Sequence, residues 1–227
     1  MIQDVGVSDG RTACDFFGRL RSLFPNVAYF ASDYGALVKV ISNEQCCLVL
    51  NATNKLLELT FRSFVFHLPE RWELLACFLY PLNILIRWYA LHFPAKRLLK
   101  NYHTGKLSTH PQEILLFCPK ALRLASEDKR FTLEEQSVLH PLKRSSHVIR
   151  AMNLLNPSYF TKEEFLRVLR HMHTALFDDG FLITGSNQDA GTPVHGGIYH
   201  KSSSGFEEIH RFGNGSPIAA TIALFKP

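Results

Sequence analysis

The residues best suited to chemistry lie near the amino terminus, where an acidic residue and two glycines surround a tight turn. Asp4 lies in a short apolar segment, and Gly6, Ser8 and Gly10 follow before a helical pattern begins. Glycines let the backbone approach a ligand closely, and the first amides of a helix can donate to it. The dinucleotide pattern GxGxxG would need a second glycine at position 8. The serine there favours a ligand without a pyrophosphate.

A second acidic residue, Asp33, follows the next buried segment of the chain. An acid at the end of a second parallel strand can accept hydrogen bonds from both hydroxyls of a ribose. The alternative is that Asp33 only begins a turn with Tyr34 and Gly35. Taken together with the glycine turn, Asp33 favours a ribose-containing ligand.

The elements that would position these residues alternate between strand and helix. Residues 2–7 and 27–31 have strand-like patterns, and residues 12–24 carry apolar side chains at helical spacing. A strand–helix–strand unit of this length implies parallel strands joined by a right-handed crossover. The alternation resumes after Pro111, and the expected helices there are 113–124 and 161–176, the second with Thr161 as its cap and Glu163 and Glu164 in its first turn. A turn is expected at 177–180, and strands are expected at 130–135, 146–152, 181–185, 196–201, 206–212 and 218–225. The last three strands are expected to be antiparallel and to close one edge of the sheet.

In order and spacing, these segments resemble those of class I S-adenosylmethionine-dependent methyltransferases. Residues 4–10 resemble the first family motif and Asp33 the ribose-binding acid, while residues 131–137, 147–156 and 176–183 resemble the third, fourth and fifth strands with their flanking loops. The resemblance implies a seven-stranded Rossmann-like α/β sheet with S-adenosylmethionine as cofactor. The cofactor-binding residues that it implies are Asp4, Gly6, Ser8, Gly10, Asp33, Gln136 and Ser137. Gln136 and Ser137 stand where relatives usually have an aspartate at the adenine.

The loop after the expected fourth strand holds the candidate catalytic residues. In the family this loop borders the transferred methyl group, so Asn153 and Asn156 would orient the acceptor and Tyr159 would form part of the pocket wall. The alternative is that Asn156 only begins a turn before the next helix. Residues 186–188 follow the fifth strand and could line the same crevice. The expected reaction is methyl transfer to a small, hydrophobic or lipidic acceptor. The alternatives are a catalytically degenerate regulatory or scaffold protein and a nicotinamide-dependent oxidoreductase.

Residues 36–111 interrupt the expected methyltransferase core of residues 1–35 and 112–227. Strand-like runs at 37–41, 46–50 and 56–66 precede the most apolar part of the chain, residues 74–93. That part has the length of a membrane span. Spanning is not expected, because the segments on both sides must join one sheet. The remaining interpretations are a helical cap, a homodimer interface, and a helix lying on a membrane. In the last, the contacts through residues 72–100 would come from Trp72, Trp88, Tyr89, Lys96, Arg97 and Lys100.

Composition narrows the remaining classes. The net charge of +5 is modest, and the basic residues lack an interleaved aromatic pattern, so nucleic acid is not an expected partner. Among the eleven histidines, His171 and His173 lie two apart on an expected helix and face different directions. His195, His200 and His210 have no carboxylates at ligand spacing, so no metal site is expected. Five cysteines without a CxxC pair, and a start without a secretory signal, predict a cytoplasmic protein, with the membrane-surface interpretation left open.

Overall fold

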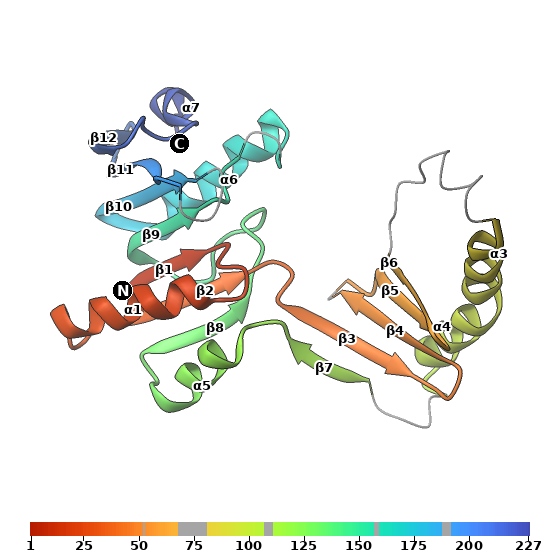
Figure 1. Ribbon diagram of the computed structural model, residues 1–227. Coiled ribbons are helices and arrows are strands. Elements are labelled where there is room, and N and C mark those ends of the chain that lie inside the picture. Colours follow the sequence, from red (N-terminus) through yellow and green to blue (C-terminus); the bar gives the residue numbers. More distant parts are fainter. Residues whose placement is uncertain (52, 68–80, 107–110, 157–158, 188–191) are drawn as a thin grey trace. The chain divides into compact units, whose positions relative to one another are not determined.

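The computed structural model describes residues 1–51, 53–67, 81–106, 111–156, 159–187 and 192–227. The chain forms two compact units (Figure 1). The first consists of Met1–Ala36 and Phe117–Pro227, and the second of Leu37–Leu116.

The first unit is built on a seven-stranded, mostly parallel sheet, which confirms the expected α/β class. Its strands are β1 (Ile2–Val5), β2 (Tyr29–Asp33), β8 (Phe131–Glu135), β9 (Ser146–Met152), β10 (Leu176–Ser186), β11 (His195–Ser202) and β12 (Gly205–Phe212). They lie in the order β12-β11-β10-β9-β1-β2-β8. The strands from β8 to β10 in that order are parallel, whereas β11 runs antiparallel to both of its neighbours. Along the chain, β2 and β8 are therefore added on one side of β1, and β9 to β12 are then added on its other side.

Two groups of helices cover opposite faces of this sheet. They are α1 (Arg11–Leu23) with α5 (Pro119–Glu127), and α6 (Lys162–Ala175) with α7 (Ala219–Leu224). On β9, Val148 packs with the α1 group and its neighbour Ile149 with the α6 group. Successive strand residues point to opposite faces, so each group has its own core.

Local sequence explains why these helices form where they do. Ala13, Cys14 and Phe17 on α1 are buried, and the Phe17 ring lies 5.2 Å from that of Phe131. The predicted cap of α6 is confirmed. Thr161 accepts a hydrogen bond from the Glu164 amide, and the Glu164 carboxylate accepts one from the Thr161 amide.

In its described residues, the second unit has a five-stranded antiparallel sheet and one helical segment. Its strands are β3 (Leu37–Ser42), β4 (Cys46–Asn51), β5 (Leu56–Phe61), β6 (Phe64–His67) and β7 (Gln112–Leu115), in the order β6-β5-β4-β3-β7. The helical segment runs through α3 (Pro81–Ala90), a π-helical turn η1 (Leu91–Ala95) and α4 (Lys96–His103). Pro94 lies inside the wide turn, which accommodates its missing amide.

Three predictions about local structure were wrong. Residues 112–115, part of the expected helix 113–124, form β7 because they pair with β3, and the helix begins only at Pro119, a residue favoured in a first helical turn. Residues 218–225 contain α7 rather than a strand, and α7 buries Ile222. Residues 177–180 lie within β10 at a shift of register, not in a turn between elements.

The apolar segment 74–93 is described only from residue 81 onward, where it is helical. Among the residues that the structure describes, no helix is long and apolar enough to cross a membrane.

Candidate ligand-binding site

Most of the predicted site residues lie in loops beside the point of the sheet where the order of the strands changes direction. From β1 the chain proceeds to β2 on one side, and from the neighbouring β9 it proceeds to β10 on the other. Ligands of open α/β sheets bind at the carboxyl ends of strands beside such a switch point. The glycine turn follows β1 and the loop 153–159 follows β9, so the two segments flank this position. They also touch, because a β-carbon on Gly6 would lie 3.0 Å from Leu154 Cδ1.

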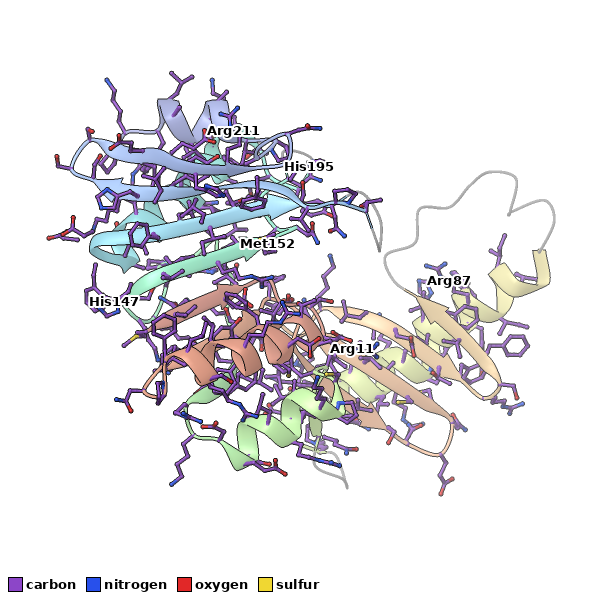
Figure 2. All side chains as sticks on the ribbon, turned by 60° about the vertical axis from the view of Figure 1, so that its left-hand side comes forward. Arg11, Arg87, His147, Met152, His195 and Arg211 are labelled. Carbon is purple, nitrogen blue, oxygen red and sulfur yellow. The ribbon has the colours of Figure 1, made fainter. Side chains whose placement is uncertain are left out.

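The glycine turn has a left-handed backbone that glycine adopts readily and serine adopts rarely. Gly6, Ser8 and Gly10 all have positive φ, at 73°, 54° and 81°. The Gly6 amide donates to the Ser32 carbonyl over 2.8 Å, and the Gly10 amide to the Val7 carbonyl over 3.0 Å. Gly10 is the N-cap residue of α1. Arg11, labelled in Figure 2, is the first residue of the helix. The turn thus presents backbone at the carboxyl edge of the sheet.

Asp33 is joined directly to this turn. Its Oδ2 accepts the Ser8 amide over 2.8 Å, and its Oδ1 accepts the Gly35 amide over 3.3 Å. Asp33 therefore does begin the turn toward Gly35 that the sequence allowed as an alternative. It also contacts the glycine turn through Ser8. Each carboxylate oxygen has two acceptor positions. The half-buried Asp33 side chain thus retains acceptor capacity for a ligand.

Asp4 occupies a different environment, because its side chain is engaged inside the α1 core. Asp4 is 1% exposed, and Arg150 Nη1 donates to its two oxygens over 2.9 and 2.8 Å. The Tyr29 hydroxyl also donates to Asp4, and the Arg150 guanidinium lies 5.0 Å from the centre of the Phe16 ring. Burial raises the pKa of Asp4, while the positive charge of Arg150 opposes that rise. This cluster ties β1, β2 and β9 together.

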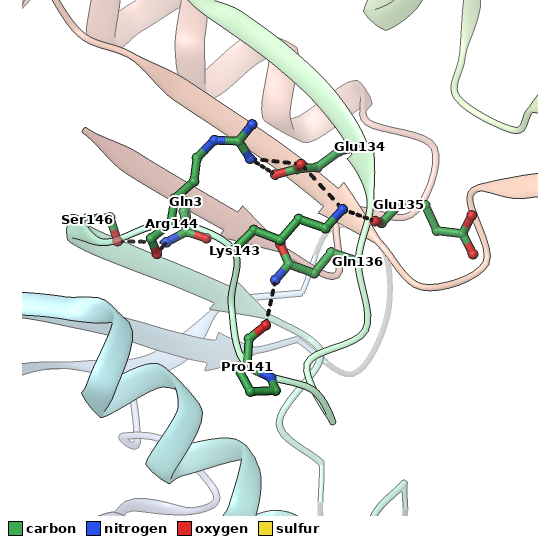
Figure 3. Close-up of polar contacts among 8 residues, drawn as sticks. All are labelled: Gln3, Glu134, Glu135, Gln136, Pro141, Lys143, Arg144 and Ser146. Atoms are coloured by element: carbon green, nitrogen blue, oxygen red, sulfur yellow. Dashed lines mark hydrogen bonds and ion pairs between the residues drawn. The ribbon is translucent and has the colours of Figure 1, made fainter.

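Gln136 and Ser137 follow β8 in a loop held by several polar contacts (Figure 3). The Gln136 amide donates to the Asp33 carbonyl over 3.1 Å, and its side-chain Nε2 to the Pro141 carbonyl over 3.5 Å. Gln136 Oε1 is buried without a hydrogen-bond partner among the described residues. Ser137 Oγ accepts the Leu139 amide over 3.2 Å. Gln136 thus lies next to Asp33 along the sheet edge and holds an unused acceptor.

The loop after β9 opens onto a cleft of about 430 Å³ at the carboxyl ends of β9 and β10. The predicted Asn153, Asn156 and Tyr159 all line it. The other lining residues are Leu155, Thr184, Gly185, Ser186, Asn187, Ser216 and Pro217. Those of its lining residues that the structure describes carry no charge at neutral pH, and their amide and hydroxyl groups can hydrogen-bond a neutral polar group.

Asn153 is held in this cleft by hydrogen bonds from its side chain and its backbone. Its Nδ2 donates to Asn187 Oδ1 over 2.8 Å, and its Oδ1 accepts the Asn187 amide over 3.0 Å. Its own amide donates to the Gly185 carbonyl over 2.8 Å, at a positive φ of 56°. These contacts fix the loop after β9 against the end of β10. Tyr159, by contrast, is 64% exposed at the rim.

Sequence reasoning anticipated part of this cleft and missed the rest. Ser186 and Asn187 lie in it as anticipated, and residue 188 lies outside the described residues. Ser216 was missed because it arrives from beyond β12, and no local pattern marks it. Arg150 was missed as the partner of Asp4 because their pairing depends on the order of the strands.

Because the glycine turn lies close to the loop after β9, a larger side chain at Gly6 should lower the stability of the protein. Gly6→Ala should destabilise the protein by about 1–3 kcal/mol, because the new β-carbon meets Leu154 and the backbone has positive φ. Gly18→Ala on α1 is the matched control, since nothing lies within 4 Å of its added β-carbon. That control should stabilise the helix by about 0.5–1 kcal/mol. Urea unfolding measures both, and equal effects would contradict the packing described.

No protein-family profile and no curated protein matches this sequence. Among solved structures, the chain is similar to LepI in complex with SAM (10% identity, TM-score 0.35), to PigF with SAH (12%, 0.34) and to the mitomycin 7-O-methyltransferase MmcR (10%, 0.36). Each similarity covers 85% of this chain but 28%, 34% and 32% of the respective solved chain. The chain thus spans about a third of the length of the structures that it matches.

Proposed function

We propose that this chain binds S-adenosylmethionine at the carboxyl ends of β1 and β2 and transfers its methyl group to a small acceptor in the cleft beside Asn153. The observation that carries the proposal is the hydrogen bond from the Ser8 amide to Asp33, which joins the glycine turn to an acid at the switch point. The order of the sequence motifs supports the same assignment.

The residues present suit this cofactor chemically. The remaining acceptor positions of Asp33 suit the two ribose hydroxyls, and the unpartnered Gln136 Oε1 suits an adenine amino group after a small rotation of the side chain. A side chain at Ser8, in place of the second glycine of GxGxxG, disfavours the close approach of a pyrophosphate. This supports S-adenosylmethionine over a nicotinamide dinucleotide.

On the acceptor side, the chain contributes positioning. The bound cofactor supplies a methyl group activated by a sulfonium. Asn153, fixed by Asn187, and the neighbouring Asn156 offer amide groups that orient a nucleophilic oxygen, nitrogen or carbon. Alignment at short distance accounts for much of the rate of such a displacement. The lining residues within the described part of the chain offer amide and hydroxyl groups, which suit acceptors that need no strong protein base.

Transfer of isotope-labelled methyl from S-adenosylmethionine tests the proposal. Purified protein is incubated with fractionated small-molecule and lipid extracts, and label in the products is measured. Asn153→Ala should lower transfer by about tenfold to a hundredfold, because the acceptor loses alignment, while S-adenosylhomocysteine still binds. Asn26→Ala, which removes an exposed asparagine between α1 and β2 at the amino end of the strand, should have no effect. Cofactor binding without transfer to any fraction would favour a catalytically degenerate methyltransferase-like protein.

A further inference from the structure

The helical segment of the second unit has an exposed face that changes from aromatic to cationic along its length. Leu85, Trp88, Tyr89 and Phe93 are 63%, 53%, 50% and 53% exposed. They recur at intervals of three and four residues, and the same spacing continues into α4. We call this the aromatic–cationic face, and its exposed residues are Leu85, Trp88, Tyr89, His92, Phe93, Lys96, Arg97 and Lys100.

The rings of this face are not part of the core of the unit. The opposite side of the segment supplies Ala90, Ala95 and Leu98, which are at most 2% exposed and pack in the core of the five-stranded sheet. Arg87, labelled on α3 in Figure 2, is 6% exposed and therefore also belongs to the buried side of the segment.

The exposed rings contact one another and form a continuous apolar surface. The Phe93 ring lies 5.2 Å from Tyr89 and 5.8 Å from Trp88, between ring centres. His92 stacks on Trp88 at 5.0 Å, and its Nδ1 lies 2.8 Å from the Trp88 carbonyl oxygen. Continuous exposed apolar surface of this kind marks an interaction site.

Charge indicates which partner fits. The unit Leu37–Leu116 holds nine Lys and Arg against five Asp and Glu, so it carries +4 of the chain's net +5. No acidic residue occurs in the sequence between Glu73 and Glu113. The three cations of the face therefore have no acidic neighbour along their own helical segment. A complementary partner must offer negative charge directly beside apolar material.

We infer that the aromatic–cationic face docks on the surface of an anionic lipid membrane. Trp and Tyr rings favour the headgroup region, where one end is apolar and the other wet. Lys and Arg one turn further along can reach anionic headgroups while their stems remain on the apolar surface. A second copy of the chain fits less well, because a two-fold contact would bring matching cations together without an acid between them. This inference does not depend on the proposed methyl transfer.

Vesicle flotation with the full chain tests this inference. The protein should float with vesicles of phosphatidylcholine mixed with phosphatidylserine, bind pure phosphatidylcholine much less, and dissociate as salt is raised. The variant Lys96→Glu with Arg97→Glu should bind the anionic vesicles at least about tenfold more weakly. The control, Lys129→Glu with Lys162→Glu, makes the same charge change at exposed positions of the other unit and should bind like the wild type.

Tryptophan fluorescence supplies the second readout. In a Trp72→Phe variant Trp88 is the remaining tryptophan, and its emission should shift to the blue and be quenched by brominated lipid. Absence of binding at low salt, or equal binding by both charge-reversal variants, would overturn the inference. Self-association that Trp88→Ala abolishes, without any lipid binding, would assign the face to a second copy instead.

Discussion

Asp33→Ala should weaken binding of S-adenosylhomocysteine by about tenfold to a hundredfold for each ribose hydroxyl that the carboxylate accepts. A hydrogen bond to a charged group contributes about 1.5–3 kcal/mol, and every 1.4 kcal/mol is a factor of ten in affinity. The substitution also releases the Ser8 amide, so the glycine turn loses the contact that joins it to β2. Calorimetric titration of the wild type and the variant measures the change.

Two further variants separate ligand contact from turn geometry and from charge. Asp33→Asn keeps an oxygen that can accept the Ser8 amide, so it should preserve the turn and bind with intermediate affinity. Asp15→Ala removes the same charge from the exposed side of α1, where Asp15 pairs with Lys120 over 2.6 Å. It should bind like the wild type. If Asp33→Ala retained full affinity, Asp33 would not be the ribose-binding residue.

Arg150→Ala should cost about 3–5 kcal/mol of folding free energy, because it leaves the Asp4 carboxylate buried without its charged partner. Arg150 is the residue that donates to both Asp4 oxygens, and the side chain of Asp4 is 1% exposed. The free energy of unfolding in urea measures the loss. Arg211→Ala is the matched control, since the Arg211 side chain is 58% exposed in its pair with Glu208 and the pair should contribute less than about 1 kcal/mol.

The cost of Arg150→Ala should also depend on pH. Burial raises the pKa of Asp4, so the folded state disfavours the ionised carboxylate relative to the unfolded chain. The folding free energy lost in this way grows as the pH rises through the pKa of Asp4 in the folded state. Without Arg150 the pKa of Asp4 rises further. The difference between wild type and variant should therefore shrink as the pH is lowered into the acid range. A small difference that is the same at every pH would contradict a buried, ionised Asp4.

The parts of the fold that could be predicted are those governed by local pattern. Helical spacing predicted α1, and Thr161 with Glu164 predicted the start of α6, because both signals lie within a few residues of the element. Residues 112–115 could not be assigned in this way, since their strand exists only through pairing with β3, far away in the chain. The sequence likewise does not show that Trp88 and Phe93 stay exposed while Ala90 and Ala95 fill the core.

The same distinction applies to the candidate site. Gly6, Gly10 and Asp33 could be placed together because each follows a strand of a parallel unit, and carboxyl ends of parallel strands lie at one edge. The environment of Asp4 could not be predicted, because it depends on the register that places Arg150 opposite it. For the cleft beside Asn153, the residues after β9 and β10 could be predicted, because each set follows a strand. The contribution of Ser216 could not be predicted.

Calorimetric titration of the wild-type chain with S-adenosylhomocysteine, repeated in the presence of excess NAD, tests the central claim most directly. The proposed function predicts saturable binding at one site that NAD does not displace. Absence of saturable binding would contradict a cofactor site at the glycine turn and Asp33. Binding of NAD in preference to S-adenosylhomocysteine would contradict methyl transfer and favour nicotinamide chemistry on the same sheet edge.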